Sequence, residues 1–179
     1  MKINMKQEKY ISIFGSYKPK KEDEEYSAAY KLSFELTKKG YIIKNGGGPG
    51  IMEASTLGAK DAGGESIGYI LDFYSRYGIT ENKNTVVCNS LFKRLQLLIE
   101  NSSAFILFSG GTGTLAELAL VWELMNKGLL NKFPIICYGD YWKPVFEIFK
   151  NNPFYVNKST LDLIDFKDSV DEIISEILK

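Results

Sequence analysis

The stretch AFILFSGGTGTLAE, residues 104–117, passes from an apolar run through a glycine-rich turn into a segment of helical composition. The run over 104–108 predicts a buried strand, and the apolar residues that recur after the turn predict a helix over 115–127. Glycine allows the backbone to turn sharply between two such elements. A strand, a glycine turn and a helix in this order form the repeating unit of a parallel α/β sheet.

The same alternation extends over the rest of the chain. Strands are expected over 10–16, 41–45, 66–71, 85–89, 104–108 and 133–139, and helices over 23–39, 51–62, 91–101, 115–127, 142–152 and 168–179. This order predicts an α/β fold, a Rossmann-like open parallel sheet flanked by helices. No repeat or linker interrupts the pattern, so residues 1–179 are expected to form a single α/β domain.

The longest connection between predicted elements is the polar segment over residues 72–84. A loop of that length inside a compact domain is often a binding loop or a lid. The sequence leaves open whether it closes over a ligand. Arg76, within this loop, is expected to be exposed to solvent rather than bound to phosphate.

Composition excludes several classes of function. The chain contains no histidine, which removes Ser-His-Asp and Cys-His nucleophile systems and histidine zinc sites. Lys+Arg and Asp+Glu are both 22, so no overall basic field favours nucleic acid. No apolar run reaches the roughly 18 residues of a membrane span. We expect a cytoplasmic protein without a metal or an organic cofactor, in which Cys88 and Cys137 are reduced core thiols.

Three predicted strands end in glycine-containing turns that lead into helices: Gly15-Ser16, residues 46–50 and residues 110–114. In a parallel sheet these turns lie along one edge, where ligands bind. Glycine brings backbone N–H groups close to an anion, and a helix N-terminus adds a favourable dipole. Tight turns also use glycine for steric reasons alone. Three converging turns nevertheless favour a site for a nucleotide or a sugar phosphate.

Two common phosphate motifs do not account for these turns. The Walker A pattern GxxxxGK[ST] is absent from the chain. Residues 111–116 fit the loose dinucleotide pattern GxGxxA, but they follow a late strand, and Asp140 is too distant to be the acidic partner of that pattern. NAD binding is therefore poorly supported.

Glu117 has two interpretations. If Thr114 caps the helix, Glu117 has the spacing of a capping box, and its carboxylate bonds back to the cap amide. In the first turn of the helix it also lies close to any ligand on the loop. There a carboxylate stabilises the cation that develops when an N-glycosidic bond breaks. Arg94 shares a helix face with Leu91 and Leu98, where a solvated cation is unusual, so it is the expected partner of Glu117 or of the ligand.

GGGPGIMEA (46–54), the helical Arg94 and GGTGTLAE (110–117) together resemble the LOG family, the cytokinin riboside 5′-monophosphate phosphoribohydrolases. The resemblance runs from about residue 10 to residue 142. It implies a homodimer, or a multiple of one, that hydrolyses a purine nucleoside 5′-monophosphate, AMP-like or N6-prenylated, to free base and ribose 5-phosphate. It also implies Arg94 and Glu117 as the catalytic pair. The substrate-binding residues that it implies are Gly15, Ser16, Gly47, Gly48, Gly50, Glu53, Gly110, Gly111, Thr112, Gly113 and Thr114.

The chain departs from the family pattern at two positions. Ser109 stands where the family usually has proline, which changes the rigidity of the turn without removing a chemical group. Leu95 stands where a lysine usually follows the arginine, which removes a cation from the site. Related proteins of the wider superfamily bind nucleotides or the molybdenum cofactor without hydrolysing a nucleotide. A non-hydrolytic carrier is therefore the alternative function.

Overall fold

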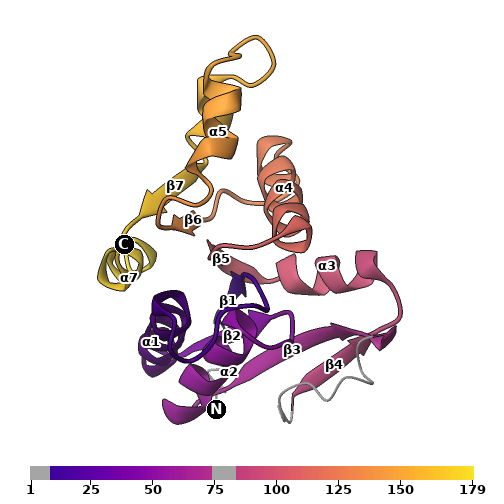
Figure 1. The fold of residues 1–179 in the computed structure, drawn as a ribbon. Coiled ribbons are helices and arrows are strands. Elements are labelled where there is room, and N and C mark those ends of the chain that lie inside the picture. The colour runs from indigo at the N-terminus through magenta and orange to yellow at the C-terminus, as the bar shows by residue number, and fades with distance from the viewer. Residues whose placement is uncertain (1–8, 74–83) are drawn as a thin grey trace, which may run out of the picture.

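The computed structural model describes residues 9–73 and 84–179 (Figure 1). Most of the predicted loop over 72–84, including Arg76, lies outside the described residues, and with it the question of a lid. In the described part of the chain, no helix is long and apolar enough to cross a membrane.

All the strand pairs of the sheet are parallel, and the strand order is β4-β3-β2-β1-β5-β6-β7. The strands are β1 (Lys9–Phe14), β2 (Tyr41–Asn45), β3 (Ser66–Leu71), β4 (Thr85–Cys88), β5 (Ser102–Leu107), β6 (Ile135–Tyr138) and β7 (Ile164–Lys167). The chain builds outward from β1 to one side up to β4, and then returns to the other side of β1 with β5. The turns after β1 and β5 thus lead to opposite faces of the sheet. The topological switch point therefore lies between these two neighbouring strands.

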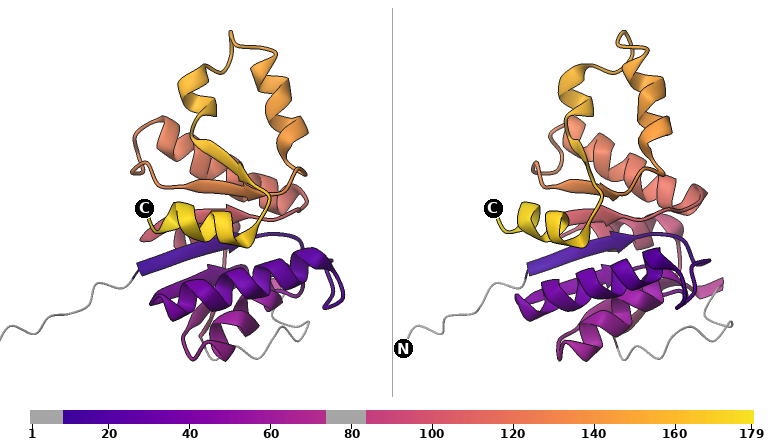
Figure 2. Two further views of the ribbon diagram at one scale, coloured as in Figure 1. Left: turned by 90° about the vertical axis from the view of Figure 1, so that its left-hand side faces the viewer. Right: turned by 60° about the vertical axis from the view of Figure 1, so that its left-hand side comes forward.

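Helices cover both faces of the sheet, as Figures 1 and 2 show. One layer contains α1 (Glu24–Lys38), α2 (Ile51–Asp61) and α7 (Val170–Ile177), and the other contains α3 (Leu91–Ile99), α4 (Thr112–Asn126) and α5 (Lys143–Lys150). The short helix α6 (Lys158–Leu161) follows α5. This arrangement confirms the predicted Rossmann-like α/β fold with a parallel sheet.

The core lies in two parts, one on each face of the sheet. Alternate strand residues such as Ile13 and Ile43 pack with α1 and α2, while Phe14 and Phe105 pack with α3 and α4. Strands buried on both faces are typical of parallel sheets, because helices cover each side. Both cysteines are buried and none is in a disulfide, as their apolar neighbours predicted.

Most predicted boundaries agree with the structure within a few residues, and the prediction for 41–45 coincides with β2. The predicted helix start at 115 is wrong, because α4 begins at Thr112, inside the glycine turn. The elements α6 and β7 were not predicted. β7 is a four-residue edge strand in which only Ile164 is buried, so it carries little hydrophobic signal.

Ser90 caps α3 as its position before an apolar periodic run predicts: its Oγ accepts a hydrogen bond from the amide of Lys93 at 3.1 Å. The opposite end of α3 is held by the sheet. The Lys44 Nζ, from β2, donates to the carbonyls of Leu97 and Glu100 at 3.0 and 2.6 Å. These contacts satisfy carbonyl groups that have no partner inside the helix. The helix that carries Arg94 is therefore fixed at both ends.

Candidate functional site

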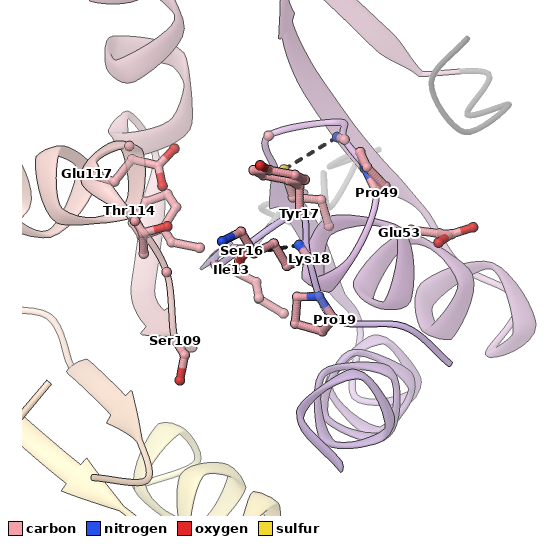
Figure 3. Close-up of a pocket in the computed structure, with 18 of the residues that line it drawn as sticks. Ile13, Ser16, Tyr17, Lys18, Pro19, Pro49, Glu53, Ser109, Thr114 and Glu117 are labelled. Atoms are coloured by element: carbon pink, nitrogen blue, oxygen red, sulfur yellow. Dashed lines mark hydrogen bonds between the residues drawn. The ribbon is translucent and has the colours of Figure 1, made fainter. Parts of the chain in front are cut away.

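A cleft of about 1500 Å³ runs along the carboxyl ends of the central strands. Figure 3 shows its walls: Ser109, Thr114 and Glu117 come from the β5–α4 segment, Ser16, Tyr17 and Lys18 from the turn after β1, and Pro49 and Glu53 from the β2–α2 segment. Further lining residues are Ile13, Phe14, Gly15, Pro19, Asp23, Glu25, Gly46, Gly48, Met52, Ile70, Leu71, Leu91, Arg94, Gly110, Gly111, Thr112, Gly113 and Tyr141. The cleft lies at the switch point, where open α/β sheets bind ligands.

The N-terminus of α4 opens into this cleft. Its N-cap is Gly111, which supplies no side-chain cap, and its first turn holds no acidic residue. In the described part of the chain, the amides of Gly111, Thr112 and Gly113 donate to no protein acceptor. Unpaired amides at the positive end of a helix dipole bind anions well. Of the three turns that the sequence suggested, this one therefore has the geometry that best suits an anion.

The capping-box interpretation of Glu117 is wrong. Because α4 starts at Thr112, Thr114 is its third residue rather than its cap, and Glu117 lies in the second turn. The Thr114 side chain instead packs over Gly110, where a Cβ would collide with it. Glycine at position 110 is therefore required for the turn to pass beneath Thr114.

Glu117 pairs with Arg94 across the two helices. Arg94 Nη1 lies 3.1 Å from Glu117 Oε1, and Arg94 Nε donates to the Tyr69 carbonyl at 2.7 Å. The side chains are 15% and 7% exposed, so the pair is largely desolvated yet borders the cleft. Burial raises the pKa of Glu117 to about 7, although the Arg94 guanidinium acts in the opposite direction. A carboxyl group with this pKa exchanges protons near neutrality.

Gly46 provides the space for the guanidinium. A Cβ at Gly46 would collide with Arg94 Nη2 and would approach Met52 Sδ to 2.7 Å. The neighbouring Gly47 has a φ of +72°, and its amide already donates to Asn45 Oδ1 at 2.8 Å. The turn over 46–50 thus uses glycine mainly for steric reasons. It contributes to the site by leaving space for the Arg94 guanidinium.

The proposed binding residues do not all reach the cleft. Gly15, Ser16, Gly48, Glu53 and the residues 110–114 line it, whereas Gly47 and Gly50 lie outside its lining. Gly50, with a φ of +68°, packs against the backbone of Ser16 and Tyr17. Glu53 borders the cleft but points away from Glu117 in Figure 3.

Ser16 links the three turns of the site. Its amide donates to the carbonyl of Ser109 at 2.9 Å, and its own carbonyl accepts from the amide of Ile51 at 3.0 Å. The backbone of Ser16 is therefore committed to the protein. Its hydroxyl accepts a hydrogen bond from the amide of Lys18 at 3.1 Å and retains its own proton for a ligand, whereas the side chain of Ile51 fills the space beside Gly15.

Two contacts of the turn between β5 and α4, residues 109–113, were not predicted from the sequence. Glu25 Oε1 accepts from the amide of Ser109 at 3.3 Å and from its Oγ at 2.5 Å. The Tyr141 hydroxyl donates to the carbonyl of Gly110 at 2.9 Å. These bonds join residues 84 and 31 positions apart, so no local pattern indicates them. The hydroxyl of Ser109 fixes the turn at the position where the LOG pattern has proline.

The second departure from the LOG pattern, Leu95, is buried at 7% exposure and belongs to the packing of α3. Because position 95 holds leucine rather than lysine, Arg94 is the cation of α3 that lines the cleft. In the part of the chain that the structure describes, no group of three or more Cys, Asp or Glu side chains is placed to hold a metal ion.

The model of the SLOG cluster4 family matches residues 8–152, most of the chain. The chain belongs to the SLOG cluster4 family. This confirms the resemblance at the level of the LOG-like superfamily. An uncharacterized protein of Archaeoglobus fulgidus is 27% identical over 128 residues, which cover 66% of this chain and 78% of that protein.

Solved structures share the fold of this SLOG cluster4 protein over nearly its whole length. The molybdenum cofactor binding protein of Rippkaea orientalis is 22% identical with a TM-score of 0.75, over 97% of this chain and 99% of that one. The molybdenum cofactor carrier protein of Chlamydomonas reinhardtii is 21% identical with a TM-score of 0.72, over 96% and 97% of the two chains. At these identities the likeness establishes a common fold.

The SLOG cluster4 match contains the whole cleft, whose lining residues fall between Ile13 and Tyr141. The elements α6, β7 and α7 follow the matched segment and contribute no lining residue. The candidate site is thus built entirely from the part of the chain that defines the family.

Proposed function

We propose that this protein hydrolyses the N-glycosidic bond of a purine nucleoside 5′-monophosphate, AMP-like or N6-prenylated, and releases the free base and ribose 5-phosphate. The observation that carries the proposal is the buried Arg94–Glu117 pair at the edge of the cleft. Phosphate binding alone needs no carboxylate, because a carboxylate repels an anion. Cleavage of a glycosidic bond does need one, to stabilise the positive charge that develops on the ribose.

The arrangement of the cleft suggests how the substrate binds. The 5′-phosphate lies on the free amides of Gly111, Thr112 and Gly113 at the start of α4. The ribose then reaches Arg94 and Glu117, one helical turn further on. Beside them the wall is apolar, with Met52, Ile70, Leu71 and Leu91, and suits a purine ring with or without a prenyl group.

In this proposal Glu117 acts in its ionised form. Its carboxylate stabilises the oxocarbenium-like ribosyl centre and orients the water that attacks the anomeric carbon. Arg94 favours the ionised form by opposing the larger effect of burial on the pKa of Glu117. The proton released by water passes to the base as it leaves. The reaction as proposed uses no metal and no organic cofactor.

We test the proposal by incubating the protein with AMP and isopentenyl-AMP and measuring free base. Wild-type protein is expected to release base from at least one of them. Glu117→Gln keeps the shape of the side chain but removes its charge. It is expected to reduce turnover by at least about 100-fold, which is the effect of losing one group that stabilises transition-state charge in other enzymes. Glu123→Gln, on an exposed part of the same helix, is the matched control and retains activity. If the wild-type protein releases no free base from any monophosphate, the enzymatic proposal is wrong.

The second candidate is a nucleotide or molybdenum-cofactor carrier that does not turn its ligand over. It is favoured by the two structural neighbours, one a molybdenum cofactor binding protein and the other a molybdenum cofactor carrier protein. A carrier retains a ligand through purification, and its Glu117→Gln variant behaves like the wild type in every assay. Mass spectrometry of the purified protein together with the activity measurement separates the two functions.

We infer a homodimer as the working assembly, as the LOG resemblance implies. Helices α3 and α4 are joined by the Arg94–Glu117 pair, and each exposes an apolar side chain, with Phe92 85% and Leu115 40% exposed. Exposed apolar surface on neighbouring helices favours burial against a partner. We propose that a second copy of this chain covers these exposed side chains. No nucleic acid or membrane partner is proposed.

A further inference from the structure

The cleft is longer than the ligand proposed above. Its lining runs from Leu71 at the end of β3, past the turns after β2, β1 and β5, to Tyr141 after β6. Adjacent strands are about 4.8 Å apart, so four strand intervals give a row roughly 19 Å long. The anion-binding turn after β5 is the fourth of these five strand ends. Arg94 and its apolar wall lie on the β3 side of the turn, and Tyr141 lies on the β6 side.

The volume of the cleft agrees with its length. About 1500 Å³ exceeds the range of roughly 300–1,000 Å³ that is usual for a small-molecule site. A nucleoside monophosphate with its phosphate on the α4 amides and its ribose at Arg94 occupies the β3 side. The β6 side, beyond the anion-binding turn, then remains open to a further group.

On the β6 side the structure holds an aromatic ring in a fixed position. The Tyr141 side chain is half-exposed, and its hydroxyl is bonded to the carbonyl of Gly110. Its ring meets the Trp142 ring edge-on, with centroids 5.1 Å apart and planes at 86°. Trp142 is buried, and its Nε1 donates to the carbonyl of Phe108 at 3.0 Å. Tyr141 therefore presents a rigid, accessible aromatic surface beside the anion-binding turn, which suits stacking of a planar ring.

A carboxylate from α1, that of Glu25, lies against the turn to which Tyr141 is bonded. Glu25 Oε1 is occupied by Ser109, the residue before Gly110, while in the described part of the chain Glu25 Oε2 accepts no hydrogen bond. A carboxylate oxygen that borders a cleft accepts hydrogen bonds from amino groups. The chemistry of this end of the cleft thus favours an aromatic heterocycle that bears an amino group.

We propose that the region around Tyr141 and Glu25 is a second ring-binding subsite, and that the cleft accepts a dinucleotide. In this ligand class two nucleosides are joined by a pyrophosphate. The pyrophosphate lies on the amides at the start of α4, one ring lies against the apolar wall beside Arg94, and the other stacks on Tyr141. The inference rests on the proposed function for the placement of phosphate on the α4 turn and extends it to a longer ligand of the same site.

The test compares AMP with diadenosine 5′,5′-diphosphate by calorimetry, in the Glu117→Gln protein so that neither ligand is hydrolysed. Stacking of a base on an aromatic side chain contributes about 1–3 kcal/mol, so the dinucleotide is expected to bind at least about fivefold more tightly. Tyr141→Ala removes the ring and brings the ratio of the two Kd values to about one. Tyr141→Phe removes only the hydroxyl, so it preserves the ratio even where both affinities fall. Tyr155→Ala, which changes an exposed tyrosine outside the cleft lining, is the control and leaves the ratio unchanged.

A Kd ratio near one in the Glu117→Gln protein overturns the subsite, as does a raised ratio that survives Tyr141→Ala. AMP binding without any gain from the second nucleoside refutes the subsite and leaves the proposed function standing. Absence of binding by both ligands removes the phosphate site itself and refutes the two proposals together.

Discussion

Glu117 is placed where burial and ion pairing act against each other. Removal from water disfavours its charged form, and the Arg94 guanidinium favours it. Burial is the larger effect, so the pKa of Glu117 rises from 4.5 to about 7. A group balanced in this way changes charge near neutrality, so the ionised fraction of Glu117 depends on pH in that range.

This balance predicts the pH dependence of turnover. If ionised Glu117 is the active form, kcat/KM rises with pH and levels off above an apparent pKa of about 7. Arg94→Met removes the group that lowers this pKa, so the rising limb moves to higher pH while the maximal rate falls. A pH–rate profile of both proteins for the monophosphate that is cleaved provides the measurement. A limb that stays in place in Arg94→Met contradicts the assigned role of Arg94.

Sequence reasoning at the residue scale identified Arg94 because its helix face is otherwise apolar. It expected Arg94 to pair with Glu117 or with the ligand, and the salt bridge to Glu117, 23 positions away, confirms the first of these, whereas the capping-box alternative is wrong because α4 begins at Thr112. It also treated Ser109 only as a missing proline. The contact with Glu25 that gives this serine its role forms only when α1 packs beside β5.

At the scale of elements, α3 depends on a lysine of the sheet. Lys44 is 3% exposed, and its Nζ lies 4.7 Å from the centre of the Tyr10 ring while it bonds the last carbonyls of α3. Burial lowers the pKa of Lys44 from 10.5 to about 8, against a smaller opposing effect of Glu100. The helix that positions Arg94 is thus attached to the sheet through a cation that folding partly desolvates.

The lowered pKa of Lys44 predicts how stability changes with pH. Between pH 8 and 10.5 the unfolded chain binds a proton at Lys44 that the folded chain has released, so stability rises with pH in this window. Lys44→Met removes this contribution. The free energy of unfolding of the wild type is expected to gain roughly 2–3 kcal/mol relative to the variant between pH 7 and pH 10. Urea titrations of both proteins at the two pH values measure it, and parallel pH curves would show that Lys44 has an ordinary pKa in the fold.

Elements with a strong periodic pattern were predicted well, and those with a weak one were not. β2 was predicted with its observed bounds because glycines mark both of its ends. The start of α4 was placed three residues late, because glycine and threonine disfavour the interior of a helix. Here they form its first turn, where the free amides face the cleft and a side-chain cap is absent. This local exception to propensity coincides with the candidate site.

At the scale of the whole molecule, parallel topology explains why three separate turns converge. The carboxyl ends of parallel strands share one edge, so glycine turns that lie far apart in the sequence become neighbours. The existence of the cleft could therefore be predicted from the alternation of strands and helices along the sequence. Its extension to Tyr141 could not, because it depends on how the segment after β6 folds back onto Phe108 and Gly110.

The dimer is a prediction about the assembled molecule. Phe92 on α3 is 85% exposed, and burying it against a second copy removes a large apolar side chain from water. Phe92→Asp introduces a charge there and is expected to convert a dimer into a monomer in light scattering at micromolar concentration. Phe154→Asp, at a site 91% exposed between α5 and α6, is the matched control and stays dimeric. A monomeric wild type, or a dimer that persists in Phe92→Asp, would show that α3 does not form the interface. Because α3 also carries Arg94, loss of the dimer is expected to lower turnover as well, and the two measurements together show whether the site needs its second copy.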